Sequence, residues 1–167
     1  EEVLHDTKWK PGLDKKEAEK ILSNYLGVEQ FIWLIAALEY DDTGGHIDNL
    51  ACFAPDNVII ALNEEDPEDS NYDRLKENLS RLSGANDING KAYEIMTIDQ
   101  PSYDSFLNER LPMSYINFYI ANNGIVMPVF NDVKDADAIE KIQNVFKNKS
   151  VVTVPGRPIV EGGGCVH

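Results

Sequence analysis

The sequence predicts an α/β fold, and three observations carry this prediction. Short apolar runs bounded by turn residues recur along the chain, for example 58–62 and 125–130, which is typical of buried strands. Segments with apolar residues at helical spacing, such as 72–82, lie between these runs. Residues 48–57 and 114–123 also match each other in pattern at a separation of 66 residues, and each is followed by an acidic loop, a helix and a strand. The repeated unit is therefore ββαβ.

The composition limits the class of protein and its partners. The chain has 167 residues, of which 43% are hydrophobic and 26% charged, as expected for one soluble globular domain. Its net charge of -14 disfavours nucleic acids and anionic membranes as partners and suits a cationic substrate. No apolar run approaches the roughly 20 residues that cross a bilayer. The two cysteines, Cys52 and Cys165, make no disulfide framework, so we expect a reducing, cytoplasmic location.

The individual elements follow from local patterns. We expect helices over 14–26, 72–82 and 135–147, and strands over 30–38, 46–53, 58–62, 92–98, 115–121, 125–130 and 151–154. Asp14 has the side chain of an N-cap, and Gly27 stands where the first helix should end. The turn residues 55–57 and 122–124 predict that the strands on either side of each turn pair as hairpins.

The repeat divides the chain into modules. The expected divisions are the end of one module over 1–40, modules over 41–99 and 113–154, and the start of a further module over 155–167. We expect the Gly-rich end to be a strand, so that unpaired edges at both ends of the array favour a homo-oligomer. Because the chain begins without Met, we expect it to be a piece of a longer protein. In the polar insert 100–112, Tyr103, Asp104 and Arg110 are candidates for a rim or lid.

One stretch, residues 41–49, concentrates three carboxylates and an imidazole around two adjacent glycines. If 46–53 is a strand, His46 and Asp48 are two residues apart and point to the same face. An imidazole beside a carboxylate suits proton transfer next to a cationic substrate. The alternative interpretation is a solvated loop, because a Gly-Gly turn flanked by acids is common on protein surfaces. Spacing alone leaves both interpretations open.

Three segments of the chain resemble motifs of the family of agmatine deiminases and bacterial peptidylarginine deiminases. Residues 41–51 resemble its His motif, 115–124 resemble a second motif, and 155–167 resemble the segment that leads into its nucleophilic cysteine. The resemblance covers essentially the whole chain, but only the second half of a family member. It implies the pentein fold, an α/β propeller in which ββαβ modules surround a pseudo-fivefold axis.

The resemblance also implies a reaction, the hydrolysis of a guanidinium group without a cofactor or a metal. A cysteine thiolate attacks the guanidinium carbon, ammonia leaves, and water hydrolyses the covalent intermediate. Carried over residue by residue, His46 is the general acid and base, Asp48 binds the guanidinium nitrogens, and Asp42 faces the distal end of the substrate. The implied reaction converts agmatine and water to N-carbamoylputrescine and ammonia, in putrescine biosynthesis. The alternative substrate within the family is an arginine residue of a peptide.

The chain departs from the family pattern at the nucleophile. In that pattern the cysteine follows directly after the histidine that corresponds here to His167, the last residue of the sequence. Cys165 lies two positions earlier, so it is either a spare thiol or a displaced catalytic cysteine whose pKa His167 could lower. We therefore expect that the chain cannot complete the reaction as it stands. The alternative from a different class is a non-catalytic fragment.

Overall fold

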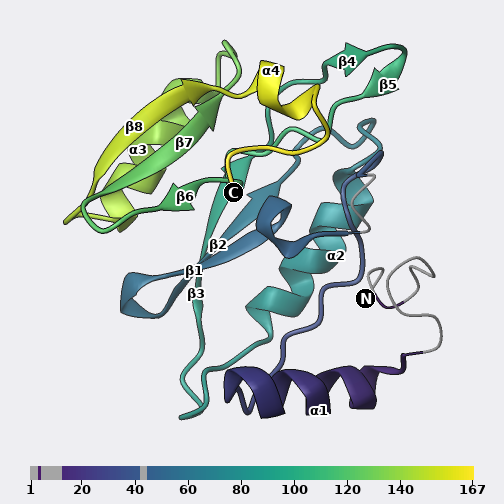
Figure 1. Ribbon diagram of the computed structural model, residues 1–167, viewed down its shortest axis with the longest axis vertical. Coiled ribbons are helices and arrows are strands. Elements are labelled where there is room, and N and C mark those ends of the chain that lie inside the picture. The colour runs from purple at the N-terminus through teal and green to yellow at the C-terminus, as the bar shows by residue number, and fades with distance from the viewer. Residues whose placement is uncertain (1–3, 5–12, 42–44) are drawn as a thin grey trace.

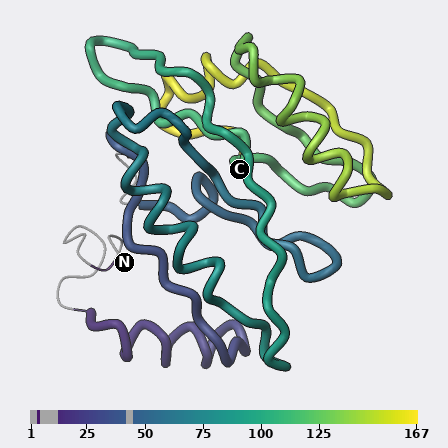
Figure 2. Tube along the Cα trace, turned by 180° about the vertical axis from the view of Figure 1, so that it is seen from behind, coloured from purple at the N-terminus to yellow at the C-terminus, as the bar shows by residue number. Residues whose placement is uncertain are grey.

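The structure is a computed structural model that describes residue 4, residues 13–41 and residues 45–167. Within these ranges the chain forms two mixed three-stranded sheets and one small hairpin (Figure 1). A helix packs on one face of each large sheet, and Figure 2 shows both helices from the opposite side. The sequence-based prediction of an α/β fold is confirmed at this level. No helix in the described ranges is long and apolar enough to cross a membrane.

The first sheet has the topology of the predicted repeat unit. Strand β1 (Ala51–Ala54) pairs antiparallel with β2 (Val58–Asn63) through the short helical turn η3 (Pro55–Asn57). Helix α2 (Tyr72–Ser83) follows, and β3 (Glu94–Asp99) then pairs parallel with β2. Every residue of β2 is buried because this strand is central in the sheet and is covered by α2.

The second sheet repeats this order. Strand β6 (Tyr119–Ile120) pairs antiparallel with β7 (Gly124–Val129), helix α3 (Asp135–Val145) follows, and β8 (Ser150–Pro155) pairs parallel with β7. A side chain at Gly124 would come within 2.9 Å of the carbonyl oxygen of Ser150. The close approach of β8 therefore requires glycine at this position.

The two hairpins are not related by one constant separation in sequence. Strand β7 begins 66 residues after β2, as predicted. Ala54 and Val58 close the first turn, whereas Ala121 donates its N–H to the carbonyl of Gly124 to close the second. The second turn is therefore one residue shorter, and its first strand is displaced by 67 residues from β1. The alignment of Ala54 with Ile120 was wrong by one position for this reason.

Helix α1 (Lys15–Leu26) has the ends that the sequence predicts. The Asp14 carboxylate accepts the N–H of Glu17 at 2.8 Å, and the Glu17 side chain reaches back to the N–H of Asp14, which completes a capping box. The helix ends at Gly27, whose φ of 66° is a left-handed conformation that glycine adopts without strain.

The predicted strand over 30–38 is wrong, because this segment is irregular. It runs along α2, and side chains of that helix satisfy its backbone groups (Figure 1). The Asn78 amide accepts the N–H of Ile35 at 2.9 Å and donates to the carbonyl of Ala36 at 2.8 Å. The Asn71 amide accepts the N–H of Glu39 in the same way. The apolar run is therefore buried against a helix instead of within a sheet.

Two further strand predictions need correction. Residues 46–53 are not one strand, because Ile47–Asn49 form a 3-10 turn (η2) and β1 begins at Ala51. The Gly-rich end of the chain is also not a strand. Arg157–Val160 form the short helix α4, and residues 164–167 are irregular.

The polar insert contains a short hairpin, β4 (Ser105–Phe106) and β5 (Glu109–Arg110). The Arg110 guanidinium donates to both oxygens of Asp69 at 2.8 Å and to the hydroxyl of Ser70 at 2.9 Å. These bonds attach the hairpin to the loop before α2, and Arg110 is only 7% exposed. The hairpin therefore has a fixed place beside the first sheet.

One hydrophobic core connects the two units. It contains residues of both central strands and of both covering helices, for example Ile60, Leu75, Ile125 and Ile142. Tyr115, which is fully buried, donates its hydroxyl to the Asp135 carboxylate at 2.6 Å, at the start of α3. Burial and this carboxylate raise the pKa of Tyr115 far above its usual value, so the phenol stays neutral.

Candidate active site

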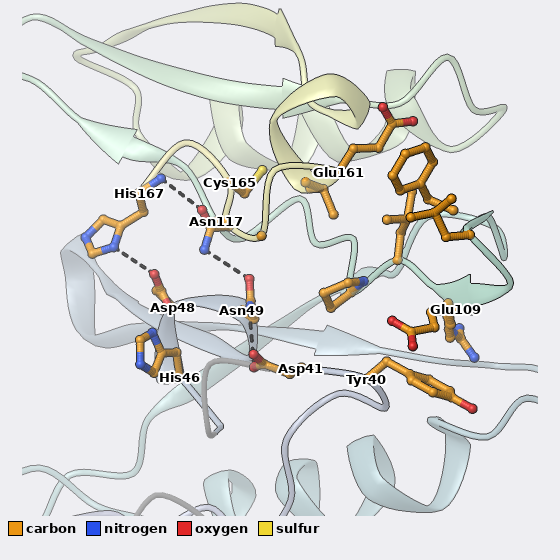
Figure 3. Close-up of a pocket in the computed structure, with 18 residues that line it drawn as sticks. Tyr40, Asp41, His46, Asp48, Asn49, Glu109, Asn117, Glu161, Cys165 and His167 are labelled. Atoms are coloured by element: carbon orange, nitrogen blue, oxygen red, sulfur yellow. Dashed lines mark hydrogen bonds and ion pairs between the residues drawn. The ribbon is translucent and has the colours of Figure 1, made fainter. Parts of the chain in front are cut away.

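A pocket of about 270 Å³ lies where the two units meet (Figure 3). Its walls come from four parts of the chain: residues 40, 41, 46, 48 and 49, the β4–β5 hairpin with the two residues after it, Asn117, and residues 160–167. Side chains 119 residues apart in sequence therefore meet in one place. The carboxylates of Asp41, Asp48, Glu109 and Glu161 give the lining an acidic character.

His46 and Asp48 both line this pocket, as their pattern suggested, but the predicted geometry is wrong. They belong to the turn η2 and its N-terminal flank, not to alternate positions of a strand. The His46 side chain is exposed, and that of Asp48 is half-buried. An exposed imidazole at the edge of a pocket is accessible to substrate and water, which a proton-transfer group requires.

The Asp48 carboxylate has a partner that the sequence did not suggest. Its Oδ2 lies 2.9 Å from Nδ1 of His167, and the two side chains are 23% and 57% exposed (Figure 3). The carboxylate therefore holds the ring of the last residue at the mouth of the pocket. The second carboxylate oxygen remains available for another donor.

Three buried polar groups connect the two units behind this pair. The Asn117 amide donates to Oδ1 of Asn49 at 3.0 Å and accepts the backbone N–H of His167 at 2.9 Å. The Ser114 hydroxyl donates to the carbonyl of Asn49 at 2.8 Å and accepts the N–H of Ile116 at 3.1 Å. Ser114 is fully buried, and Asn117 and Asn49 are 3% and 8% exposed. The network is therefore shielded from water, and hydrogen bonds are stronger in such a buried environment than in solvent.

The structure brings Cys165 to the pocket but does not activate it. Burial, with a further contribution from the negative charge of Asp48, raises the pKa of the Cys165 thiol to about 11. A reactive cysteine needs a lowered pKa, because the thiolate is the nucleophile. The environment of Cys165 therefore favours a neutral thiol at physiological pH.

The far rim of the pocket consists of Tyr40, Glu109 and the tip of the β4–β5 hairpin (Figure 3). Arg110 lines the pocket and lies 5.4 Å from the ring centroid of Tyr103, which stacks on the guanidinium. Asp104 accepts a hydrogen bond from Nε of Arg157 at 2.6 Å and so attaches the insert to α4. The three residues suggested for a rim thus anchor the hairpin that forms it.

Asp42, the candidate for the distal end of a substrate, lies outside the described residues. Among the residues that the structure describes, no group of three or more His, Cys, Asp and Glu side chains is arranged to hold a metal ion.

The sequence motifs assigned no role to Asn49, Ser114 or Asn117. One signal for Asn117 was present, because it is a polar residue within the apolar run 115–121. A polar side chain at a core position must find a hydrogen-bond partner, which makes it a candidate for a buried network. Its partners, however, come from parts of the chain 68 and 50 residues away, and no local pattern indicates them.

Comparison with known proteins gives matches along the whole chain. The family model of the Porphyromonas-type peptidyl-arginine deiminase matches residues 1–167. The agmatine deiminase of Pseudomonas syringae pv. tomato is 36% identical over 185 aligned residues, which cover 100% of this chain and 50% of that protein. That of Pseudomonas fluorescens is 35% identical with the same coverage. The chain thus spans about half the length of the curated relatives that it matches.

Solved structures give the same result for the fold. The agmatine deiminase of Enterococcus faecalis superimposes with a TM-score of 0.87 at 28% identity, over 94% of this chain and 48% of that one. A C315S agmatine deiminase of C. jejuni, solved with substrate bound, has a TM-score of 0.89 at 25% identity, over 99% and 48%.

Proposed function

We propose that this chain, which belongs to the Porphyromonas-type peptidyl-arginine deiminase family, contributes part of an active site that hydrolyses the guanidinium group of agmatine. The products would be N-carbamoylputrescine and ammonia, in putrescine biosynthesis. The agmatine deiminases among its relatives support this choice of substrate. We place the two ββαβ units in a pentein propeller with a pseudo-fivefold axis, and the protein in the cytoplasm.

The observation that carries the proposal is the acidic pocket with Asp48 at its mouth. Arg110 at the rim is paired with Asp69 and Glu161 with Arg157, so the negative charge of the lining depends on Asp41, Asp48 and Glu109. A cationic guanidinium is attracted to such a pocket, and a carboxylate is its preferred partner because both oxygens can accept N–H groups. In the structure His167 occupies one acceptor position of Asp48 Oδ2, and the remaining lone pairs of the carboxylate can accept the N–H groups of a guanidinium.

Each residue then has a distinct role. Asp48 binds the guanidinium nitrogens and stabilises the positive charge of the thiouronium intermediate that forms when ammonia leaves. A thiolate forms a bond to the guanidinium carbon, and the C–N bond to the departing nitrogen breaks. His46 donates a proton to that nitrogen, which leaves as ammonia, and then accepts a proton from the water that hydrolyses the intermediate. We place the thiolate at the position that follows His167, as the family pattern implies, and not at Cys165, whose raised pKa disfavours the thiolate.

Calorimetric titration of the 167-residue chain with agmatine tests this proposal. Asp48→Asn should weaken binding about tenfold or more, since a charge-assisted hydrogen bond is worth roughly 1.5–3 kcal/mol. Asp56→Asn is the matched control: it makes the same change of charge at an exposed turn residue outside the pocket and should leave the affinity unchanged.

Two comparison ligands define what the pocket recognises. Putrescine has no guanidinium group and should bind more weakly than agmatine. A peptide with an internal arginine has the guanidinium but not the terminal ammonium, and tighter binding of this peptide would favour the peptidyl substrate instead. Equal affinity of the wild type and Asp48→Asn for agmatine would contradict the proposed site.

A further inference from the structure

Asn117 has a position that the proposed chemistry does not explain. It lines the pocket, yet it is 3% exposed, and both polar atoms of its side chain have partners. Oδ1 accepts the backbone N–H of His167, and Nδ2 donates to Oδ1 of Asn49. Replacing a buried amide whose oxygen and nitrogen both form hydrogen bonds lowers stability more than replacing a surface amide.

Neighbouring residues determine which atom of the Asn117 amide donates and which accepts. The Asn49 amide donates Nδ2 to the Asp41 carboxylate at 3.5 Å, and this leaves Oδ1 of Asn49 as the acceptor that faces Asn117. Asn117 must then donate through Nδ2 and present Oδ1 to His167. The reversed amide would set donor against donor at His167 and acceptor against acceptor at Asn49. Asp41 therefore orients Asn117 through Asn49.

His167 is consequently held at two points. Asn117 holds its backbone N–H at 2.9 Å, and Asp48 holds its ring at 2.9 Å. Residues 164–167 form no helix or strand, so no regular structure places this end of the chain. Side chains of the two units place it instead, one from η2 and one from the segment before β6.

We infer that Asn117 is a positioning residue, which holds the backbone of His167 so that its ring lies against the Asp48 carboxylate. It acts through His167, because both polar atoms of its side chain are already bonded within the protein. The inference rests on the proposed function for its consequence, since a displaced His167 would change what a guanidinium meets at Asp48. The effect of Asn117 on the position of His167 can be tested with the 167-residue chain in the absence of substrate.

A purely structural role for Asn117 would be to join the two units. Ser114 provides the comparison for this role, because its hydroxyl also bridges the units through Asn49, is also buried, and has no bond to His167. Ser114→Ala therefore removes a bridge of the same kind and leaves the attachment of His167 intact. Asn117→Leu keeps the branched shape of the side chain and removes both polar atoms.

Nuclear magnetic resonance of the ¹⁵N-labelled 167-residue chain tests the inference. In Asn117→Leu, exchange of the His167 amide with solvent should become about tenfold faster or more, because a protecting hydrogen bond is lost. The ring ¹⁵N signals of His167 should move toward those of a histidine free in solution. Ser114→Ala should change neither the amide exchange rate nor the ring ¹⁵N signals of His167. Asn117→Asp retains an acceptor for the amide but turns its second oxygen toward Oδ1 of Asn49, so it should restore only part of the protection.

Three outcomes would overturn the inference. These are an unchanged His167 amide in Asn117→Leu, equal changes in Ser114→Ala, or no difference between the aspartate and leucine variants. If Asn117→Leu does not fold, Asn117→Ser, which is polar but too short to span both partners, takes its place with the same expectations. Agmatine is absent from these measurements, so a failure of the proposed function in the titration would not be confused with a failure here.

Discussion

At the scale of single residues, Asp48 determines the properties of its neighbours. Its carboxylate holds the His167 ring at 2.9 Å, and its charge adds to the burial that raises the pKa of Cys165 to about 11. The same group is our candidate for guanidinium binding. One carboxylate thus provides an anionic site for a cation and adds to the burial that keeps the adjacent thiol protonated.

The raised pKa of Cys165 predicts slow alkylation that keeps accelerating with pH. Because the thiolate is the reactive form, the rate with iodoacetamide should rise about tenfold per unit between about pH 7 and pH 10. Peptide mass spectrometry separates this site from Cys52. In Asp48→Asn the rate at a given pH should increase, since a negative charge has been removed. A plateau near pH 8 in the wild type would contradict the environment described here.

The sequence indicated His46 and Asp48 because they are two residues apart and could be judged together. It did not indicate the bond between Asn117 and His167, which are 50 positions apart, or the pairing of His167 with Asp48, 119 positions away. Such contacts depend on how two folded units meet, and hydrophobic periodicity carries no information about that. The prediction that His46 and Asp48 share a strand face was wrong, although both do line one pocket.

At the scale of elements, a buried arginine attaches the β4–β5 hairpin to the loop before α2. Arg110 is bound to Asp69 and Ser70, and the side chains of the Arg110–Asp69 pair are only 6% and 13% exposed. Burial alone would raise the pKa of Asp69, but hydrogen bonds from Arg110 and from the N–H of Asn71 outweigh it, so that the pKa is lower than usual. The pair therefore stabilises the fold when Asp69 is ionised.

Arg110→Met should lower the free energy of unfolding by about 3 kcal/mol at pH 7, because it leaves a largely buried carboxylate without its partner. A carboxyl group with a lowered folded-state pKa contributes stability above its unfolded-state pKa, near pH 4, and loses it as the pH falls further. The difference between variant and wild type in urea unfolding should thus shrink below about pH 4.

Lys141→Met is the control for this substitution. Lys141 forms an i,i+4 pair with Asp137 on the surface of α3, where the side chains are 33% and 59% exposed. Such pairs contribute less than about 0.5 kcal/mol. The proposed role of the buried pair would be contradicted if both variants lost the same free energy of unfolding. A loss in Arg110→Met that does not change with pH would also contradict it.

Local signals predicted the elements whose ends are fixed locally. The capping box at Asp14 and the glycine at position 27 define α1 without help from the rest of the chain. The segment 30–38 has the composition of a strand, but amide side chains of α2 provide the partners of its backbone. The sequence pattern of such a run indicates that it is buried, but it does not indicate whether the run pairs with a strand or packs against a helix.

At the scale of the whole molecule, the two ββαβ units share one core. Residues of both central strands belong to the same hydrophobic cluster, among them Ile60 of β2 and Ile125 of β7, each fully buried. The units are therefore expected to unfold together, even though each has its own sheet.

Ile60→Val and Ile125→Val test this expectation, each in a different unit. Each should lower the free energy of unfolding by about 1 kcal/mol, the usual cost of one buried methyl group. Within each protein, circular dichroism and Trp fluorescence should report one common urea midpoint, and this midpoint should be lower in both variants than in the wild type. Two separate transitions, with each substitution shifting only one of them, would show that the units unfold independently.

The central claim is that His46 and its surroundings perform the proton transfers of guanidinium hydrolysis. A chimera tests it most directly, in which residues 1–167 replace the matching segment of the Pseudomonas syringae agmatine deiminase, and ammonia release from agmatine is measured. We predict that the chimera is active, that His46→Ala lowers its rate by about 100-fold or more, and that Asp56→Asn does not. Equal rates with and without the His46 imidazole would contradict the account.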